Sequence, residues 1–274
     1  MTASSIRAAT LLLMAAATGL LAAAPSRPAA QNLTAAAMLT AARNAIGGDA
    51  KIRGLKALRL TGSEWASQWV IGGRVQTLET PMEVRWAFPS RFLRISVSPP
   101  ATIESRNGFD GDRVISTTNG KPSRKPYTRQ AAELLLLVLA RTESWGGLVF
   151  DAMGPHAIQV RGPDGYAARL EFDAASRLPS RLIYRERRQI RLPKNPSGGS
   201  AGQARGGGGG GGGGLSTEDL PEVEMTVELH DRRAVDGLLL PSRISTSAQG
   251  VKLWELRFEE IVVNPPLTAA DFAP

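Results

Sequence analysis

The chain has 274 residues, 42% of them hydrophobic, with 33 Lys or Arg against 25 Asp or Glu. This length allows a sizeable core, and mainly β chains of this size commonly form one domain. There is no cysteine, which excludes disulfides and a lipid anchor on a cysteine. The net charge of +8 is mild, so we interpret it as scattered solvated charge and predict no nucleic-acid partner.

The first 30 residues are predicted to be a secretory signal peptide. Arg7 precedes an uncharged stretch, residues 8–24, that is rich in Leu and Ala. The alternative is a membrane-anchoring helix, but the stretch is short for a span and only weakly apolar. Export with cleavage, after Ala24 or Ala30, is therefore favoured. Because no cysteine could carry a lipid anchor, the mature protein is predicted to be soluble in a bacterial periplasm.

Residues 31–274 are predicted to form a single domain that begins with a helix and continues as strands. Thr34 is the candidate N-cap of the helix, and Gly47-Gly48 ends it. Apolar and polar residues then alternate, as in half-buried strands. Thr61-Gly62 is predicted to be the turn after the first strand, and Gly72-Gly73 the turn of a hairpin.

Two segments interrupt the strands that follow. Residues 130–142 contain Leu134 to Leu139, a run that is apolar on every side of a helix. We predict a buried helix, with a buried strand as the alternative. Residues 193–215 contain an unbroken glycine tract, Gly206 to Gly214, whose backbone entropy makes ordering costly. We predict that this segment is a disordered loop insertion between two strands.

The sequence offers no catalytic arrangement. It has two histidines, His156 and His230, and no Gly-x-Ser-x-Gly nucleophile motif. Neither histidine has a second histidine at metal-ligand spacing, and Asn107 to Asp112 is typical of a turn rather than of a calcium loop. We therefore predict no catalytic residues, no metal site, no cofactor and no enzymatic activity.

Aromatic residues are few, yet most of them fall in predicted strands. Two interpretations stay open: they fill an ordinary core, or they line a concave sheet that holds an acyl chain together with the apolar helix. The residues predicted to line such a cavity are Trp65, Trp69, Trp86, Phe88, Phe92, Leu134, Leu135, Val138 and Trp254.

The succession of these elements resembles the LolA/LolB family of periplasmic lipoprotein carriers. The resemblance covers most of the mature chain and depends on the order of several short motifs. They are Ala45-Ile46-Gly47-Gly48, Gly108-Phe109-Asp110-Gly111, the strands that begin Leu178-Pro179-Ser180-Arg181 and Leu240-Pro241-Ser242-Arg243, and the ending from Phe258 to Leu267. The resemblance implies a mainly β fold: a strongly curved antiparallel sheet, or incompletely closed β-barrel, with covering helices.

The resemblance also implies a function. The chain would be a lipoprotein-sorting chaperone that carries acyl chains of lipoproteins or lipids in an apolar cavity towards the outer membrane. Its other partners would be transient, a membrane or an envelope protein. The missing cysteine favours the soluble carrier over the membrane-anchored receptor. Two alternatives remain: a non-catalytic sensor or regulatory module that binds a protein, and an exported hydrolase.

Overall fold

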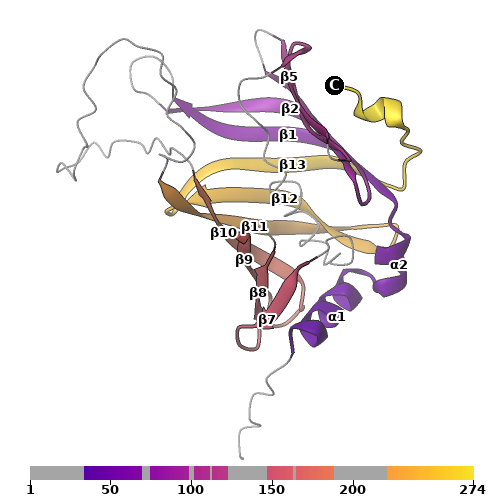
Figure 1. The fold of residues 1–274 in the computed structure, drawn as a ribbon, viewed down its shortest axis with the longest axis vertical. Coiled ribbons are helices and arrows are strands. Elements are labelled where there is room, and N and C mark those ends of the chain that lie inside the picture. The colour runs from indigo at the N-terminus through magenta and orange to yellow at the C-terminus, as the bar shows by residue number, and fades with distance from the viewer. Residues whose placement is uncertain are drawn as a thin grey trace, which may run out of the picture. The chain divides into compact units, whose positions relative to one another are not determined.

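The computed structural model describes residues 34–69, 75–98, 102–111, 113–122, 147–162, 165–187 and 221–274 (Figure 1). All of them belong to one compact unit, Asn32–Pro274. The predicted signal peptide, the apolar run at 134–139 and the glycine tract lie outside the described residues.

The described residues fold into one antiparallel sheet with short helices beside it. The helices are α1 Ala35–Ile46, α2 Asp49–Gly54 and the 3-10 helix η3 Ala269–Phe272. The strands are β1 Ala57–Trp69, β2 Val75–Ala87, β3 Arg91–Ser98, β4 Ile103–Asp110, β5 Arg113–Thr118, β6 Lys121–Pro122, β7 Val149–Ala152, β8 Ala157–Arg161, β9 Ala167–Phe172, β10 Pro179–Arg187, β11 Glu222–Val235, β12 Leu238–Ala248 and β13 Val251–Val263. Their order in the sheet is β6-β5-β4-β3-β2-β1-β13-β12-β11-β10-β9-β8-β7.

Two meanders make up this sheet. Strands β1 to β6 run outwards in chain order, and strands β7 to β13 run back towards β1. The first and last strands of the chain pair with each other, with Leu58 opposite Val263 and Trp65 opposite Glu255. No ladder joins β6 to β7 within the described segments, so the sheet stays open. The predicted fold class, a mainly β, incompletely closed antiparallel sheet, is confirmed.

The sheet is strongly curved. One hydrophobic cluster contains Trp86 of β2 and Phe109 of β4 together with Ile158 of β8 and Leu182 of β10. These strands are far apart in the sheet, so their side chains can meet only if the sheet bends around them. We call the side of the sheet that carries Trp86 the inner face, and the opposite side the outer face.

Helix α1 packs against the same cluster. Thr34 caps it as predicted: the Ala37 N–H donates to Thr34 Oγ1 at 3.2 Å. Met38, Leu39, Ala42 and Ile46 form its buried stripe, and they belong to the cluster that holds the strands together. The helical periodicity read from the sequence therefore identifies the side of α1 that faces the core.

One predicted turn is wrong, and another is shorter than predicted. Gly62 lies inside β1, at a β-bulge against β13, rather than in a turn. A Cβ atom on Gly62 would lie 1.9 Å from the carbonyl oxygen of Arg257, so glycine is needed there because two strands approach closely. Strand β4 likewise continues to Asp110, and the chain turns only at Gly111, where φ is 62°.

Asn264 fastens the start of β1 to the end of β13. Its Oδ1 accepts hydrogen bonds from the backbone N–H groups of Lys56 at 2.6 Å and Ala57 at 3.1 Å. Its Nδ2 donates to the Gly54 carbonyl at 3.2 Å. The φ of Asn264 is 52°, a left-handed conformation that asparagine tolerates better than most residues. This one side chain therefore bridges the two ends of the folded chain.

On the outer face, Glu255 is a buried carboxylate surrounded by cations. Its side chain is 1% exposed. Arg257 Nε donates to it at 2.6 Å, Lys252 Nζ also pairs with it, and Arg243 Nη1 lies 3.6 Å away. Removal from water raises the pKa of Glu255, but the hydrogen bonds from Lys252 and Arg257 together lower it by more. The pKa therefore lies below its usual value.

Replacing Asn264 by Ala should weaken the pairing of β1 with β13. The change removes three hydrogen bonds and leaves a Cβ-bearing residue at positive φ, so the free energy of unfolding should fall by about 2–3 kcal/mol, as measured in urea. Asn264→Gly separates the two causes, since it relieves the backbone while still losing the hydrogen bonds. An Asn264→Ala protein as stable as wild type would contradict this role.

Replacing Glu255 by Gln should lower the free energy of unfolding at pH 7 by about 2–3 kcal/mol, because hydrogen bonds to an ionised group are lost. Since the folded pKa is below the unfolded value of about 4.3, the wild-type contribution is complete above that pH and is lost as the pH falls below it. In urea unfolding, the free energy of unfolding should therefore fall less between neutral and acid pH in the variant than in wild type. Glu79→Gln, at an exposed glutamate on β2, is the matched control. Parallel acid declines for Glu255→Gln and wild type would refute the assignment.

Candidate functional site: the inner face of the sheet

The period-two alternation of the strands builds the inner face. In β2 the side chains of Met82, Val84 and Trp86 point inwards and are at most 5% exposed. Directly opposite Trp86 lie Leu58 of β1 on one side and Phe92 of β3 on the other. The side chains nearest to Trp86 on its own and adjacent strands are therefore apolar.

Aromatic rings cluster around Trp86. Its ring stacks on Phe88, with centroids 4.6 Å apart, and meets Phe92 edge to face at 5.5 Å. Phe92 in turn stacks on Phe109 at 5.9 Å. Gly108 allows this contact, because a Cβ atom there would lie 2.0 Å from the carbonyl oxygen of Phe92. Sequence reasoning missed Phe109 because it placed this residue in a turn.

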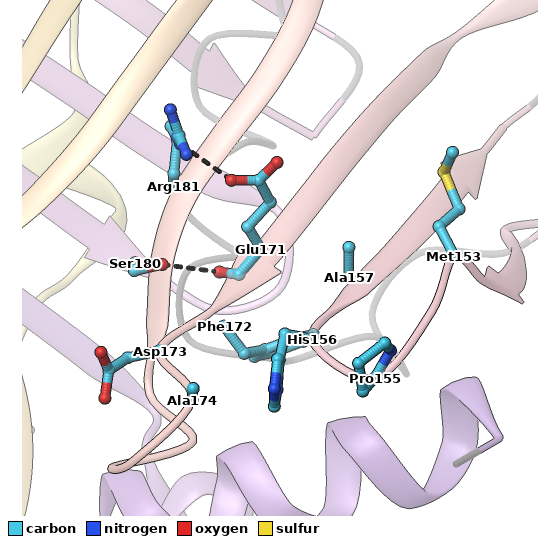
Figure 2. Close-up of a pocket in the computed structure, with 10 residues that line it drawn as sticks. All are labelled: Met153, Pro155, His156, Ala157, Glu171, Phe172, Asp173, Ala174, Ser180 and Arg181. Carbon is cyan, nitrogen blue, oxygen red and sulfur yellow. Dashed lines mark hydrogen bonds and ion pairs between the residues drawn. The ribbon is translucent and has the colours of Figure 1, made fainter. Parts of the chain in front are cut away.

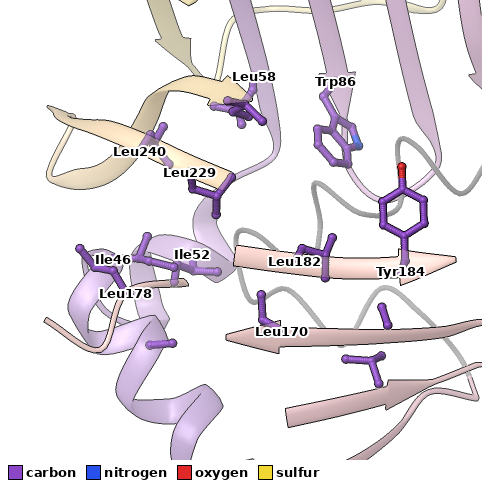
Figure 3. Packing of buried hydrophobic residues seen from close by; sticks show 14 of the residues in the cluster. Ile46, Ile52, Leu58, Trp86, Leu170, Leu178, Leu182, Tyr184, Leu229 and Leu240 are labelled. Atoms are coloured by element: carbon purple, nitrogen blue, oxygen red, sulfur yellow. The ribbon is translucent and has the colours of Figure 1, made fainter. Parts of the chain in front are cut away.

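Residues from the other meander complete the interior. Figure 3 shows Trp86 on one side and Tyr184 and Leu182 of β10 on the other, with α1 and α2 near one end. Tyr184 is 8% exposed and Leu182 is fully buried. Tyr184 was also missed from the sequence, although it alternates with Leu182 on one face of its strand. Strand β10 faces β2 only because the sheet curves, and no local pattern in the sequence encodes that curvature.

A polar row borders the aromatic cluster on the same face. Arg94 follows Phe92 at a spacing of two residues, so both side chains point inwards. Arg94 forms an ion pair with Glu64, and the two side chains are 26% and 18% exposed. On the next strands Ser116 Oγ donates to Asn107 Oδ1 at 3.2 Å. On β3, β4 and β5 the inner face therefore changes from apolar to polar along the strands, whereas on β2 it stays apolar as far as Met82.

The described part of the chain places the predicted cavity residues on both faces. Trp86, Phe88, Phe92 and Trp254 belong to the inner-face cluster or pack against it. Trp65 lies on the outer face, where Arg257 covers its ring at 4.6 Å and its Nε1 donates to Ser63 Oγ at 3.0 Å. For Trp69 only the strand position is described. Leu134, Leu135 and Val138 lie outside the described residues.

The basic strand β10 carries no cationic stripe. Its outward-pointing arginines each lie opposite a glutamate of β11: Arg181 opposite Glu228 and Arg185 opposite Glu224. Arg181 Nε also contacts Glu171 of β9 at 2.8 Å. Charges of both signs alternate across these ladders, so this part of the outer face is a solvated surface stabilised by cross-strand pairs.

A shallow pocket with a volume of about 410 Å³ lies beside the turns that lead into β8 and β10 (Figure 2). It is lined by Met153, Pro155, His156, Ala157, Glu171, Phe172, Asp173, Ala174, Ser180 and Arg181. It includes a histidine, a serine and carboxylates, so it is the place to test for a hydrolytic site.

The polar groups of this pocket are engaged in other contacts. His156 Nδ1 lies 3.0 Å from Arg177 Nη1, and because a guanidinium only donates, this nitrogen is an acceptor and is not free to act as a base. Ser180 Oγ donates to the Glu171 carbonyl at 3.2 Å. The backbone N–H and hydroxyl of Ser176 donate to Asp173 and lower the pKa of its carboxyl. No nucleophile and base contact each other in this pocket.

His230 contacts a serine on the outer face, also without forming a triad. Its Nε2 lies 2.9 Å from Ser245 Oγ and 3.8 Å from Glu228 Oε2. A triad needs the carboxylate on the opposite ring nitrogen, where it can orient the imidazole. Both groups here lie on the same nitrogen, so the arrangement is that of a cross-strand polar cluster.

Two further observations bear on the class of protein. Across the described residues, no three His, Asp or Glu side chains are grouped closely enough to hold a metal ion. No helix in the described part of the chain is both long and apolar enough to cross a membrane.

A scan against protein-family models finds no match, and a search of curated proteins also finds none. Among solved structures, the chain is similar to a LolA superfamily protein from Nitrosomonas europaea, with 10% identity, 88% of this chain and 98% of that chain covered, and a TM-score of 0.46. It is similar to a domain described as an outer membrane lipoprotein-sorting protein from Vibrio parahaemolyticus, with 12% identity, coverage of 85% and 95%, and a TM-score of 0.46. It is also similar to a DUF1329 family protein from Desulfovibrio piger, with 9% identity, coverage of 87% and 97%, and a TM-score of 0.47.

Two of these structures carry the names of the family that the sequence resembles. All three likenesses are below 25% identity and below a TM-score of 0.5. The proposals below therefore rest on the contacts of this chain itself.

Proposed function

We propose that this chain is an exported carrier that binds the acyl chains of lipoproteins or lipids on its inner face and transfers them towards the outer membrane. One observation carries the proposal: an apolar cluster on the concave side of the described sheet, bordered on β3, β4 and β5 by a polar row. Such a surface matches an amphiphile, which has an apolar chain and a polar end. Residues 1–30 would direct export, residues 31–274 would form the carrier domain, and 193–215 would be a loop insertion in it.

The proposed contacts are the aromatic residues of the inner face. They are Trp86, Phe88, Phe92 and Trp254, which pack in or against the cluster. Leu134, Leu135 and Val138 are proposed to cover the chain from a helix. Trp65 is not among the contacts, because it lies on the outer face beneath Arg257.

Carriage of this kind requires burial and no chemical step. Each methylene group removed from water contributes about 0.8 kcal/mol, so a long acyl chain supplies a large gross driving force. Part of that force is offset by the loss of freedom on binding and by contacts that the protein must break. No ladder joins β6 to β7 among the described residues, and a sheet that is open there would be able to adjust its curvature around a ligand.

A sensor or regulatory module that binds a protein partner is the second candidate. The observation that favours it is the burial of Trp86 and Phe92, which are only 1% and 3% exposed within the chain itself. A core that is already filled would need no lipid. The two candidates differ in whether the interior opens for an acyl chain, and a binding experiment decides between them.

The mature protein should take up a fluorescent fatty acyl probe, and protein purified gently from the periplasm should carry acylated molecules detectable by mass spectrometry. Trp254→Ala should weaken probe binding about fivefold, which corresponds to about 1 kcal/mol of lost apolar contact. Trp65→Ala makes the same chemical change on the outer face and should leave probe affinity unchanged.

Three outcomes are informative. Weaker binding in Trp254→Ala alone supports the carrier. Equal weakening in both variants would place the probe elsewhere. A wild-type protein that carries no lipid, binds no probe and copurifies with one stable protein partner would replace the carrier with the regulatory module.

A further inference from the structure

The indole N–H of Trp86 is a buried donor that has no acceptor among the described residues. Trp86 is 1% exposed, and its Nε1 has no hydrogen-bond partner among the residues that the structure describes. A buried donor that is left unpaired is costly, and most such groups in folded proteins find a partner. This one is therefore a point on the inner face where an acceptor from a ligand would be stabilised.

The nearest inward-pointing side chains on β1, β2 and β3 do not offer the Trp86 N–H an acceptor. The cross-strand neighbours are Leu58 and Phe92, and the next inward-pointing residue along β2 is Val84. None of these side chains carries a hydrogen-bond acceptor. The ring is also fixed in orientation, because it stacks on Phe88 at 29° and meets Phe92 at 83°. The N–H cannot turn towards another group without breaking both ring contacts.

The direction of the N–H is inwards. In Figure 3 the indole nitrogen lies on the side of the ring that faces Tyr184 of β10, across the interior of the curved sheet. Trp86 and Tyr184 belong to the same buried cluster. The donor thus points across the inner face towards β10, the face on which the proposed function places the acyl chain.

The polar row gives the position of Trp86 along a bound amphiphile. Arg94 lies one inward-pointing residue beyond Phe92 on β3, and adjacent inward residues of a strand are about 7 Å apart. In an acylated glycerol or lipoprotein, the carbonyl carbon lies a few bonds from the polar end and begins the apolar chain. Phe92, whose ring contacts Trp86, occupies the corresponding boundary on β3, next to the Arg94–Glu64 pair.

We propose that the Trp86 N–H donates a hydrogen bond to the carbonyl oxygen of the ester or amide that joins the acyl chain to its polar end. This inference rests on the proposed acyl-carrier function and narrows the ligand to acyl compounds, as opposed to alkyl compounds of the same length. This hydrogen bond fixes where along the inner face the bound acyl chain begins.

The test compares two ligands that differ in one carbonyl group, palmitoylglycerol and 1-O-hexadecylglycerol, each competing against the fluorescent probe. Wild-type protein should bind the ester about threefold to tenfold more tightly than the ether, the range expected for one neutral hydrogen bond. Trp86→Phe keeps an aromatic ring and removes the N–H, so it should bind both ligands with equal affinity. Phe92→Leu is the matched control, and it should weaken both ligands while keeping the preference.

A measurement on the wild-type protein covers the case in which Trp86→Phe does not fold. The indole ¹H–¹⁵N resonance of Trp86, assigned by elimination with Phe substitutions at the other tryptophans, should shift downfield with the ester and much less with the ether. A wild-type protein that binds both ligands equally, or a Trp86→Phe protein that keeps the preference, would overturn the hydrogen bond and leave the carrier function standing. A wild-type protein that binds neither ligand would overturn the carrier function itself.

Discussion

The pairing of β1 with β13 is the constraint on which the rest of the structure depends. It is the one ladder that joins the two meanders in the described sheet, and it brings together residues about two hundred positions apart, such as Leu58 and Val263. Closing so long a stretch of chain costs entropy, which local contacts cannot offset. The seam is accordingly reinforced: Gly62 permits close approach to Arg257, and Asn264 binds the backbone at the start of β1.

The curvature of the sheet, which depends on the pairing of β1 with β13, distinguishes a concave face from a convex face. Bending brings Trp86 and Phe109 from one meander against Leu182 and Tyr184 from the other, so the concave side becomes a continuous core. Much of the convex side carries charged side chains, and among them Glu255 is buried beneath its own cation partners. Helix η3 adds a small apolar cluster on the convex side, where Phe272 packs with Leu93 of β3 and Ile115 of β5.

Local pattern in the sequence predicted much of this fold. The cap at Thr34, the buried stripe of α1 and the alternation of β2 and β13 all follow from rules that act within a few residues. The errors occurred where a glycine serves a neighbouring strand: Gly62 was interpreted as a turn, although its role is set by Arg257 some two hundred residues away. The site was predictable only in part for the same reason, since Trp65 and Trp86 look alike in sequence but lie on opposite faces, and Phe109 and Tyr184 join the cluster only through curvature.

A carrier must hold its ligand and also release it, and the inner face is suited to both. Its aromatic rings already pack against one another, with Trp86 between Phe88 and Phe92, so in the proposed carrier an entering chain would replace contacts that the protein makes with itself. The net gain is then much smaller than the gross burial of the chain, which keeps binding reversible. A single hydrogen bond to the ligand adds little to the affinity, but it fixes the position of the ligand. In the proposed carrier, the Trp86 N–H, which has no partner among the described residues, would therefore contribute more to selecting the ligand than to the strength with which it is held.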